Sequence, residues 1–89
     1  MCLLKELTDK LVSRKYKVGR QDDDYMTCSR LSNEIMVRVR ENDGEMYLSI
    51  CATYRVAVID DHTYLQTHSA QAFNSSDIDN FLQVLDRSI

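Results

Sequence analysis

The fold is decided by residues 34–52, which read EIMVRVRENDGEMYLSICA. Before Asp43-Gly44, apolar residues alternate with polar and charged ones, which is the period of a strand with one buried face. An Asp-Gly pair favours a two-residue type I′ turn, because both central residues of that turn need a positive φ. The segment therefore predicts a β-hairpin that reverses at Asp43-Gly44.

The turn also predicts which residues of the hairpin face each other. Reversal at Asp43-Gly44 pairs Val39 with Leu48 and Val37 with Ile50, so the apolar rows of the two strands coincide. A slip by one residue would bring polar side chains opposite that row. The other side of the hairpin then carries four large side chains, Met36, Arg38, Arg40 and Tyr47.

An amphipathic helix is predicted on each side of this hairpin. Leucines recur at helical spacing from Leu3 to about Arg14, opposite a charged face. Near the other end, Ser76 and Asp79 match a capping box, with Ser76 as the N-cap. The apolar residues that follow continue the helical period as far as Ile89.

Further short strands are expected between the helices. Residues 25–30, 54–59 and 63–68 have strand-like patterns, and a short strand or extended segment follows the first helix at 16–18. The acidic run 21–24 reads as a loop. We therefore expect a single α+β domain over 1–89: an N-terminal helix, an antiparallel meander of four to five strands and a C-terminal helix, with both helices on one sheet face.

Charge is distributed unevenly along the chain. The net charge is −3 at pH 7, but residues 1–20 carry six Lys or Arg against two Asp or Glu, whereas residues 21–89 carry five against twelve. Such an acidic surface repels nucleic acid from most directions and favours basic partners. A basic N-terminal segment remains available for other contacts.

No signal or membrane segment is expected, because charges begin at Lys5 and recur through the first helix. The predicted location is the cytoplasm, with no membrane partner. The three cysteines are odd in number and lack a C-x-x-C spacing, so they predict neither disulfides nor a zinc site. We expect reduced thiols that act as small buried hydrophobic residues.

Residues that could carry catalysis are few. Asp60, Asp61, His62 and His68 form the one acid and histidine cluster in the sequence, but their spacing is not that of a metal site. No glycine-rich phosphate loop or G-x-S-x-G motif is present. The sequence therefore predicts no enzyme activity, no metal and no cofactor.

One resemblance covers about half of the chain. From Leu3 to Ile50, an amphipathic helix, the stretch Lys15-Tyr16-Lys17-Val18, an acidic loop and the Asp-Gly hairpin follow in order. This arrangement loosely resembles small acidic phage anti-CRISPR proteins of the Cas9-inhibiting kind. The resemblance implies a stoichiometric inhibitor that plugs a nucleic-acid groove. The carboxylates standing in for phosphates would be those of Asp22, Asp23, Asp24, Glu41, Asp43 and Glu45.

The leading hypothesis is thus a non-enzymatic module that binds a protein partner with a basic surface. The alternative is a nucleic-acid-binding regulator, since guanidinium groups beside an aromatic ring, as at Arg38, Arg40 and Tyr47, can neutralise and stack a single strand. An exposed edge strand would also permit a homodimer.

Overall fold

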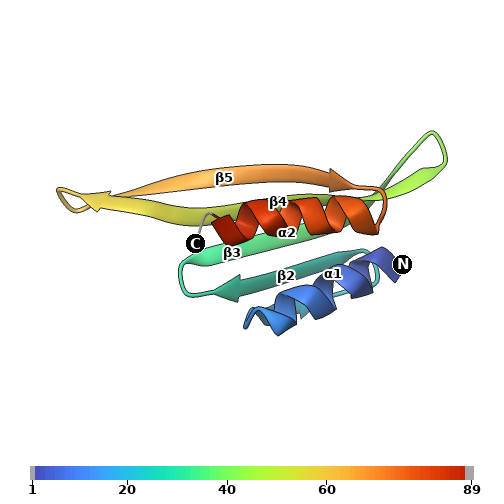
Figure 1. Ribbon diagram of the computed structural model, residues 1–89, viewed down its shortest axis with the longest axis horizontal. Helices are drawn as coiled ribbons and strands as arrows, with labels where there is room; N and C mark the ends of the chain where they lie inside the picture. The colour runs from blue at the N-terminus through green and yellow to red at the C-terminus, as the bar shows by residue number, and fades with distance from the viewer. Residues whose placement is uncertain (1, 88–89) are drawn as a thin grey trace.

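The computed structural model describes residues 2–87 as an α+β domain with a single five-stranded antiparallel sheet. The strands lie in the order β1-β2-β3-β4-β5, and both helices cover the same face of the sheet (Figure 1). The predicted fold is therefore confirmed, with five strands. The elements are α1 (Cys2–Ser13), β1 (Lys17–Gln21), β2 (Tyr25–Arg30), β3 (Asn33–Asn42), β4 (Glu45–Ile59), β5 (His62–Ala72) and α2 (Ser75–Arg87).

The predicted hairpin and its register are confirmed in β3 and β4. Val37 lies opposite Ile50 and Arg40 lies opposite Tyr47. The turn residues Asp43 and Gly44 have φ of 53° and 79°, as a type I′ turn requires.

The core lies between the sheet and the two helices. Val37 and Ile50 meet Leu7 of α1 and Ile78 of α2 in one cluster of buried side chains. Each large apolar side chain buried in this way stabilises the fold by about 1.5–3 kcal/mol relative to an exposed one. Ile89, which the apolar repeat of the second helix included, lies outside the described residues.

β4 is one continuous strand of 15 residues. The return strand of the hairpin and the strand predicted at 54–59 are joined, because no glycine, proline or turn pair interrupts the chain between them. Beyond Thr53, β4 has no partner in β3 and pairs only with β5, with a register shift between Arg55 and Ala57. This two-stranded extension, residues 55–66, is called the β4–β5 arm, and the molecule reaches 48 Å along its longest axis.

The N-cap of α2 differs from the prediction. The Asn74 side-chain oxygen accepts a hydrogen bond from the Asp77 backbone N–H at 3.0 Å, and the Asp77 carboxylate accepts one from the Phe73 N–H at 2.8 Å. The predicted cap at Ser76 with Asp79 was therefore wrong by two residues. Asn is as good an N-cap as Ser, so the sequence held two capping patterns in succession.

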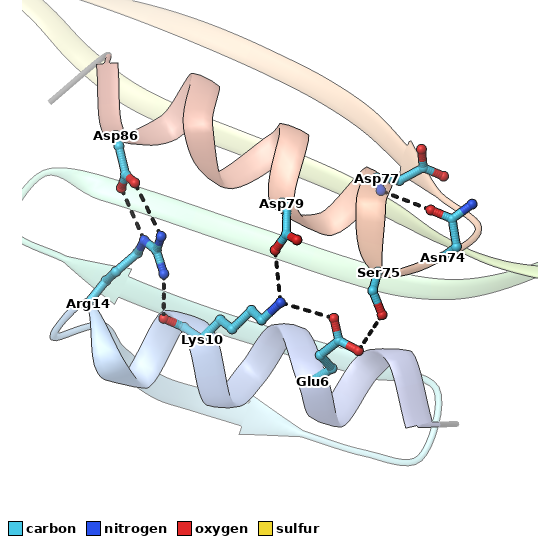
Figure 2. Close-up of polar contacts among 8 residues, drawn as sticks. All are labelled: Glu6, Lys10, Arg14, Asn74, Ser75, Asp77, Asp79 and Asp86. Atoms are coloured by element: carbon cyan, nitrogen blue, oxygen red, sulfur yellow. Dashed lines mark hydrogen bonds and ion pairs between the residues drawn. The ribbon is translucent and has the colours of Figure 1, made fainter.

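Asp79, which was predicted to belong to the cap of α2, instead takes part in the polar contacts between the two helices (Figure 2). Lys10 Nζ lies 2.8 Å from Asp79 Oδ1 and 3.2 Å from Glu6 Oε2, while the Ser75 hydroxyl donates to Glu6 Oε1 at 2.7 Å. The basic N-terminal segment is therefore partly neutralised within the fold, which limits the free basic surface expected from the sequence.

A second ion pair joins Arg14, just after α1, to Asp86 in the last turn of α2. The Arg14 guanidinium donates two hydrogen bonds to the Asp86 carboxylate, at 3.1 and 3.2 Å, and a third to the Lys10 carbonyl (Figure 2).

The Glu6 and Lys10 contacts predict how stability varies with pH. Hydrogen bonds from Ser75 and Lys10 lower the pKa of Glu6 below its ordinary 4.5, and the bond to Asp79, followed by that to Glu6, raises the pKa of Lys10. A lowered carboxyl pKa contributes stability above the unfolded pKa and loses it as pH falls through the folded one. We expect wild type to melt above Glu6→Gln at pH 7 and the gap to close near pH 2, in thermal melts. A gap that stays constant across this range would contradict the assignment.

Candidate functional site

The face of the sheet away from the helices holds the large polar side chains predicted there. Side chains alternate across a strand, so the positions between the buried residues of β3 point away from α1 and α2. Arg38 and Arg40 are exposed on β3, and Tyr47 is half-buried opposite Arg40 on β4. We call the central part of this surface the open face. It comprises Arg20, Tyr25, Met36, Arg38, Arg40, Tyr47, Ser49, Cys51 and Phe73.

Tyr25 is a component of the open face that the sequence analysis did not place. It lies opposite Arg38 in the register of β2 with β3. The guanidinium carbons of Arg20 and Arg38 lie over its ring, 5.3 and 5.1 Å from the centroid. Such cation–π contacts are worth about 0.5–1 kcal/mol at exposed sites. The alternating pattern of residues 25–30 indicated a strand, but only the β2–β3 register shows which face Tyr25 occupies.

A second aromatic contact borders the open face at Tyr47. The Phe73 ring, just after β5, stacks on Tyr47 with centroids 5.1 Å apart and planes inclined by 27°. Phe73 is 40% exposed, so this pair is partly accessible. Sequence reasoning missed Phe73, since its position depends on where β5 ends.

A shallow depression of about 370 Å³ lies at the centre of the open face. It is lined mainly by Tyr25, Met36, Arg38, Arg40 and Cys51. This volume is at the lower limit of ligand pockets, and two guanidinium groups border it. The depression can therefore accept a protruding side chain or a small anionic group.

The charge of the open face is unbalanced. Among residues 2–87, neither Arg38 nor Arg40 has an acidic partner within ion-pair distance, whereas Arg20 pairs with Asp22 at 3.1 Å. Two unpaired guanidinium groups therefore remain available to a carboxylate or phosphate.

The structure brings the predicted carboxylates to one end of the sheet. The β1–β2 turn carries the run 22–24, and the β3–β4 turn with the strand ends beside it carries the others. Both turns lie at the same end of the sheet (on the right in Figure 1). The Val39 N–H donates to the Asp24 carbonyl at 2.9 Å, which fixes the first turn against β3 about 13 Å from Asp43. We call this group the acidic end. Its members are Asp22, Asp23, Asp24, Glu41, Asp43 and Glu45, all of them exposed.

The acid and histidine cluster does not assemble. Asp60 and Asp61 form the turn of the β4–β5 arm, and His62 begins β5 beside them. His68 lies six residues along the strand, about 20 Å away, and stacks on Phe81 of α2 with centroids 5.8 Å apart. Within the described part of the chain, no three His, Cys, Asp or Glu side chains are placed to hold a metal ion.

The three thiols are free, and they differ in burial. Cys28 is buried in the core, as expected for a small hydrophobic residue, and desolvation raises its pKa to about 12. Cys51 is half-buried on the open face, and Cys2 is exposed on α1. The expectation of buried thiols is therefore wrong for Cys2, which follows from its place outside the leucine row of the helix.

Comparison with protein-family models, curated proteins and solved structures finds no match to this chain. Neither of the two helices described between residues 2 and 87 has the length and apolar content needed to cross a membrane.

Proposed function

We propose that the protein is a non-enzymatic binding module that docks a protein partner on the open face and the adjoining acidic end. The observation that carries this proposal is the open face itself. Both helices cover the other side of the sheet, while Arg38, Arg40, Tyr47 and Met36 remain on an uncovered surface. Arg, aromatic and Met side chains are enriched at protein interfaces, and Arg and Tyr are prominent among hot spots.

The proposed partner presents both signs of charge. Its carboxylates would meet Arg38 and Arg40, and its basic surface would meet the acidic end. Opposite potentials of this kind increase association rates and fix orientation more than they raise affinity. A protein whose nucleic-acid groove is basic fits the second requirement, so we propose a phage or mobile-element inhibitor of a host defence protein, as the anti-CRISPR resemblance implies. We place its action in the cytoplasm.

Nucleic acid is the second candidate ligand. Tyr25 supports it, because it adds an aromatic ring beside Arg38 on the open face. Two features favour protein instead. Arg20 and Arg38 already lie over the Tyr25 ring, and Phe73 stacks on Tyr47, so both rings already have stacking partners within the fold. The six carboxylates at the acidic end also repel a phosphate backbone.

Affinity capture from a host lysate tests the proposal through matched variants. Truncating a hot-spot arginine costs about 2 kcal/mol, roughly 30-fold in affinity. We expect the wild type to capture a protein that the double variant Arg38→Ala, Arg40→Ala loses at least tenfold, measured by quantitative mass spectrometry. The triple variant Asp22→Asn, Asp23→Asn, Asp24→Asn should also lose it.

The control is Lys5→Ala with Asp9→Ala, which removes an exposed ion pair on α1, on the far side of the sheet. This variant should retain the partner. A mobility shift with a 20-nucleotide single-stranded DNA at low salt provides the competing readout. Retardation by wild type at micromolar concentration, lost in the arginine variant, would overturn the protein-binding proposal in favour of nucleic acid.

A further inference from the structure

The two edges of the sheet differ in how they are protected. β1 has five residues, carries Lys17 and Arg20, and its pairing with β2 is irregular at Gly19. These are the features that prevent an edge from pairing with another strand. β5 has eleven residues, HTYLQTHSAQA, with no Lys, Arg, Asp, Glu or Pro. The β5 edge therefore lacks the features that would keep another strand from pairing with it.

The β4–β5 arm adds apolar surface next to this edge. An isolated two-stranded hairpin is at best marginally stable in water, and the arm extends beyond the cover of β3. Its large apolar side chains are half or more exposed: Val56 52%, Val58 57%, Ile59 56%, Tyr64 50% and Leu65 63%. Of these residues, Tyr64 and Leu65 lie on the free edge strand β5, on opposite faces of the sheet, while the others lie on β4.

We propose that two copies of the chain associate through antiparallel pairing of β5 with β5, about a two-fold axis at Thr67. Residues whose numbers sum to 134 would then lie opposite each other, and the two sheets would form one sheet of ten strands. Because β5 carries no Lys, Arg, Asp or Glu, this pairing places no such like charges opposite each other along the edge. Two-fold dimers are the commonest homo-oligomers, since one surface serves both copies.

The register is set by Tyr64. This residue is paired with Ala57 of β4 and lies on the helix-bearing face, like Ala70. In the proposed register Tyr64 lies opposite Ala70 of the second copy. Ala70 lines an apolar groove of about 200 Å³ between β5 and α2, together with His68, Phe81 and Val84. A large ring therefore meets a small residue and a groove that can receive it.

Neighbouring registers fit less well. A shift of two residues in one direction places Tyr64 opposite His68, whose ring already stacks on Phe81. A shift in the other direction places it opposite Ala72, which is fully buried and does not line this groove. Odd shifts would place the helices of the two copies on opposite faces, away from this contact.

The surface is large enough for a stable pair. Eleven residues span about 36 Å, and a sheet is about 10 Å thick, so the two edges bury roughly 700 Å² in total. The large side chains of Tyr64 and Leu65 extend beyond this strip in both copies, and their outer parts bring the total towards about 1,000 Å², the lower limit for a biological interface. Neither the arginines of the open face nor the acidic end is used, so this inference stands independently of the proposed function.

The oligomeric state tests the inference. We expect wild type to show twice its 10.4 kDa mass in light scattering after size exclusion at about 100 μM. Thr67→Lys places two ammonium groups opposite each other at the axis and should give a monomer with an unchanged circular dichroism spectrum. Val56→Lys is the control: it alters an equally exposed residue of the arm that lies on β4, so it should leave the dimer intact.

Cross-linking tests the register. Facing Cα atoms of an antiparallel pair lie about 4.5–5.5 Å apart, within disulfide range. Thr67→Cys should therefore form a covalent dimer on mild oxidation. Ser69→Cys, equally exposed and two residues away, should not, since it faces Leu65 of the second copy. Both variants carry Cys51→Ser, because Ser69 lies opposite Cys51 in the register of β4 with β5.

Three results would overturn the inference: a monomeric wild type, a dimer that survives Thr67→Lys but not Val56→Lys, or equal cross-linking of both cysteine variants. Capture of the protein partner by the Thr67→Lys variant distinguishes a failure of the dimer inference from a failure of the proposed binding function. We expect that capture to be unchanged, because Thr67 lies on the edge strand β5, two strands from Arg38 and Arg40 of β3, and is not part of the acidic end.

Discussion

Val37→Asp is expected to unfold the protein, whereas Arg38→Asp, one residue further along the same strand, is expected to leave it folded. Val37 is fully buried against the helices, and Arg38 is exposed on the open face. An unpaired carboxylate in the core costs several kcal/mol even after its pKa rises. Domains have about 5–15 kcal/mol of stability in total, so the first substitution removes most or all of it.

Urea denaturation followed by circular dichroism measures both effects. We expect Val37→Asp to lack a cooperative transition at neutral pH, and Arg38→Asp to unfold within about 1 kcal/mol of wild type. The less disruptive variant Val37→Ala should lower the free energy of unfolding by about 1–3 kcal/mol. Similar midpoints for the two Asp variants would mean that the strand does not present alternate faces as described.

The second large effect concerns the thiols, and we expect Cys28 to react with a thiol reagent at least about 100-fold more slowly than Cys2 at pH 8. Burial raises the pKa of Cys28 from 9.0 to about 12, so its thiolate fraction falls about 1,000-fold. The greater nucleophilicity of a high-pKa thiolate recovers roughly 20-fold. Limited access adds to the remaining difference, because only 4% of Cys28 is exposed.

Stopped-flow and manual measurements with a chromogenic disulfide reagent resolve the three phases. Cys2→Ser should remove the fast phase and Cys28→Ser the slowest one, while Cys51 reacts at an intermediate rate. In 6 M guanidinium chloride all three thiols should react together. A folded protein whose thiols all react at one rate would show that the core around Cys28 opens far more readily than its packing indicates.

The central hairpin was predictable because its signals are local and mutually consistent. The Asp43-Gly44 turn fixes the register within two residues, and the apolar rows on either side agree with it. The position of Arg38 and Tyr47 on the open face followed from the same alternation. Once a turn and a period specify the same pairing, no distant contact is needed to decide it.

What was missed depends on contacts between distant parts of the chain. The placement of Tyr25 requires the β2–β3 register, and the turn at Leu31 that sets it carries no Gly or Pro, although Leu31 adopts a φ of 54°. The cap at Asn74 competed with an equally good pattern two residues later. The ion pair between Lys10 and Asp79 joins residues 69 positions apart, and no local sequence pattern reveals it.

The pairing of α1 with α2 has a consequence for how this chain can vary. Contacts between residues 6 and 75, 10 and 79, and 14 and 86 advance together, so the two helices run parallel. That direction follows from the odd number of strands between them, since each hairpin reverses the chain. Insertion or loss of a single strand would turn α2 end over end and break all three contacts at once, together with its match to the core. A change by a whole hairpin would keep the direction of α2 but move it by two strand spacings, about 10 Å, away from or towards α1. The contacts between the helices therefore depend on five strands and not only on an odd number of them.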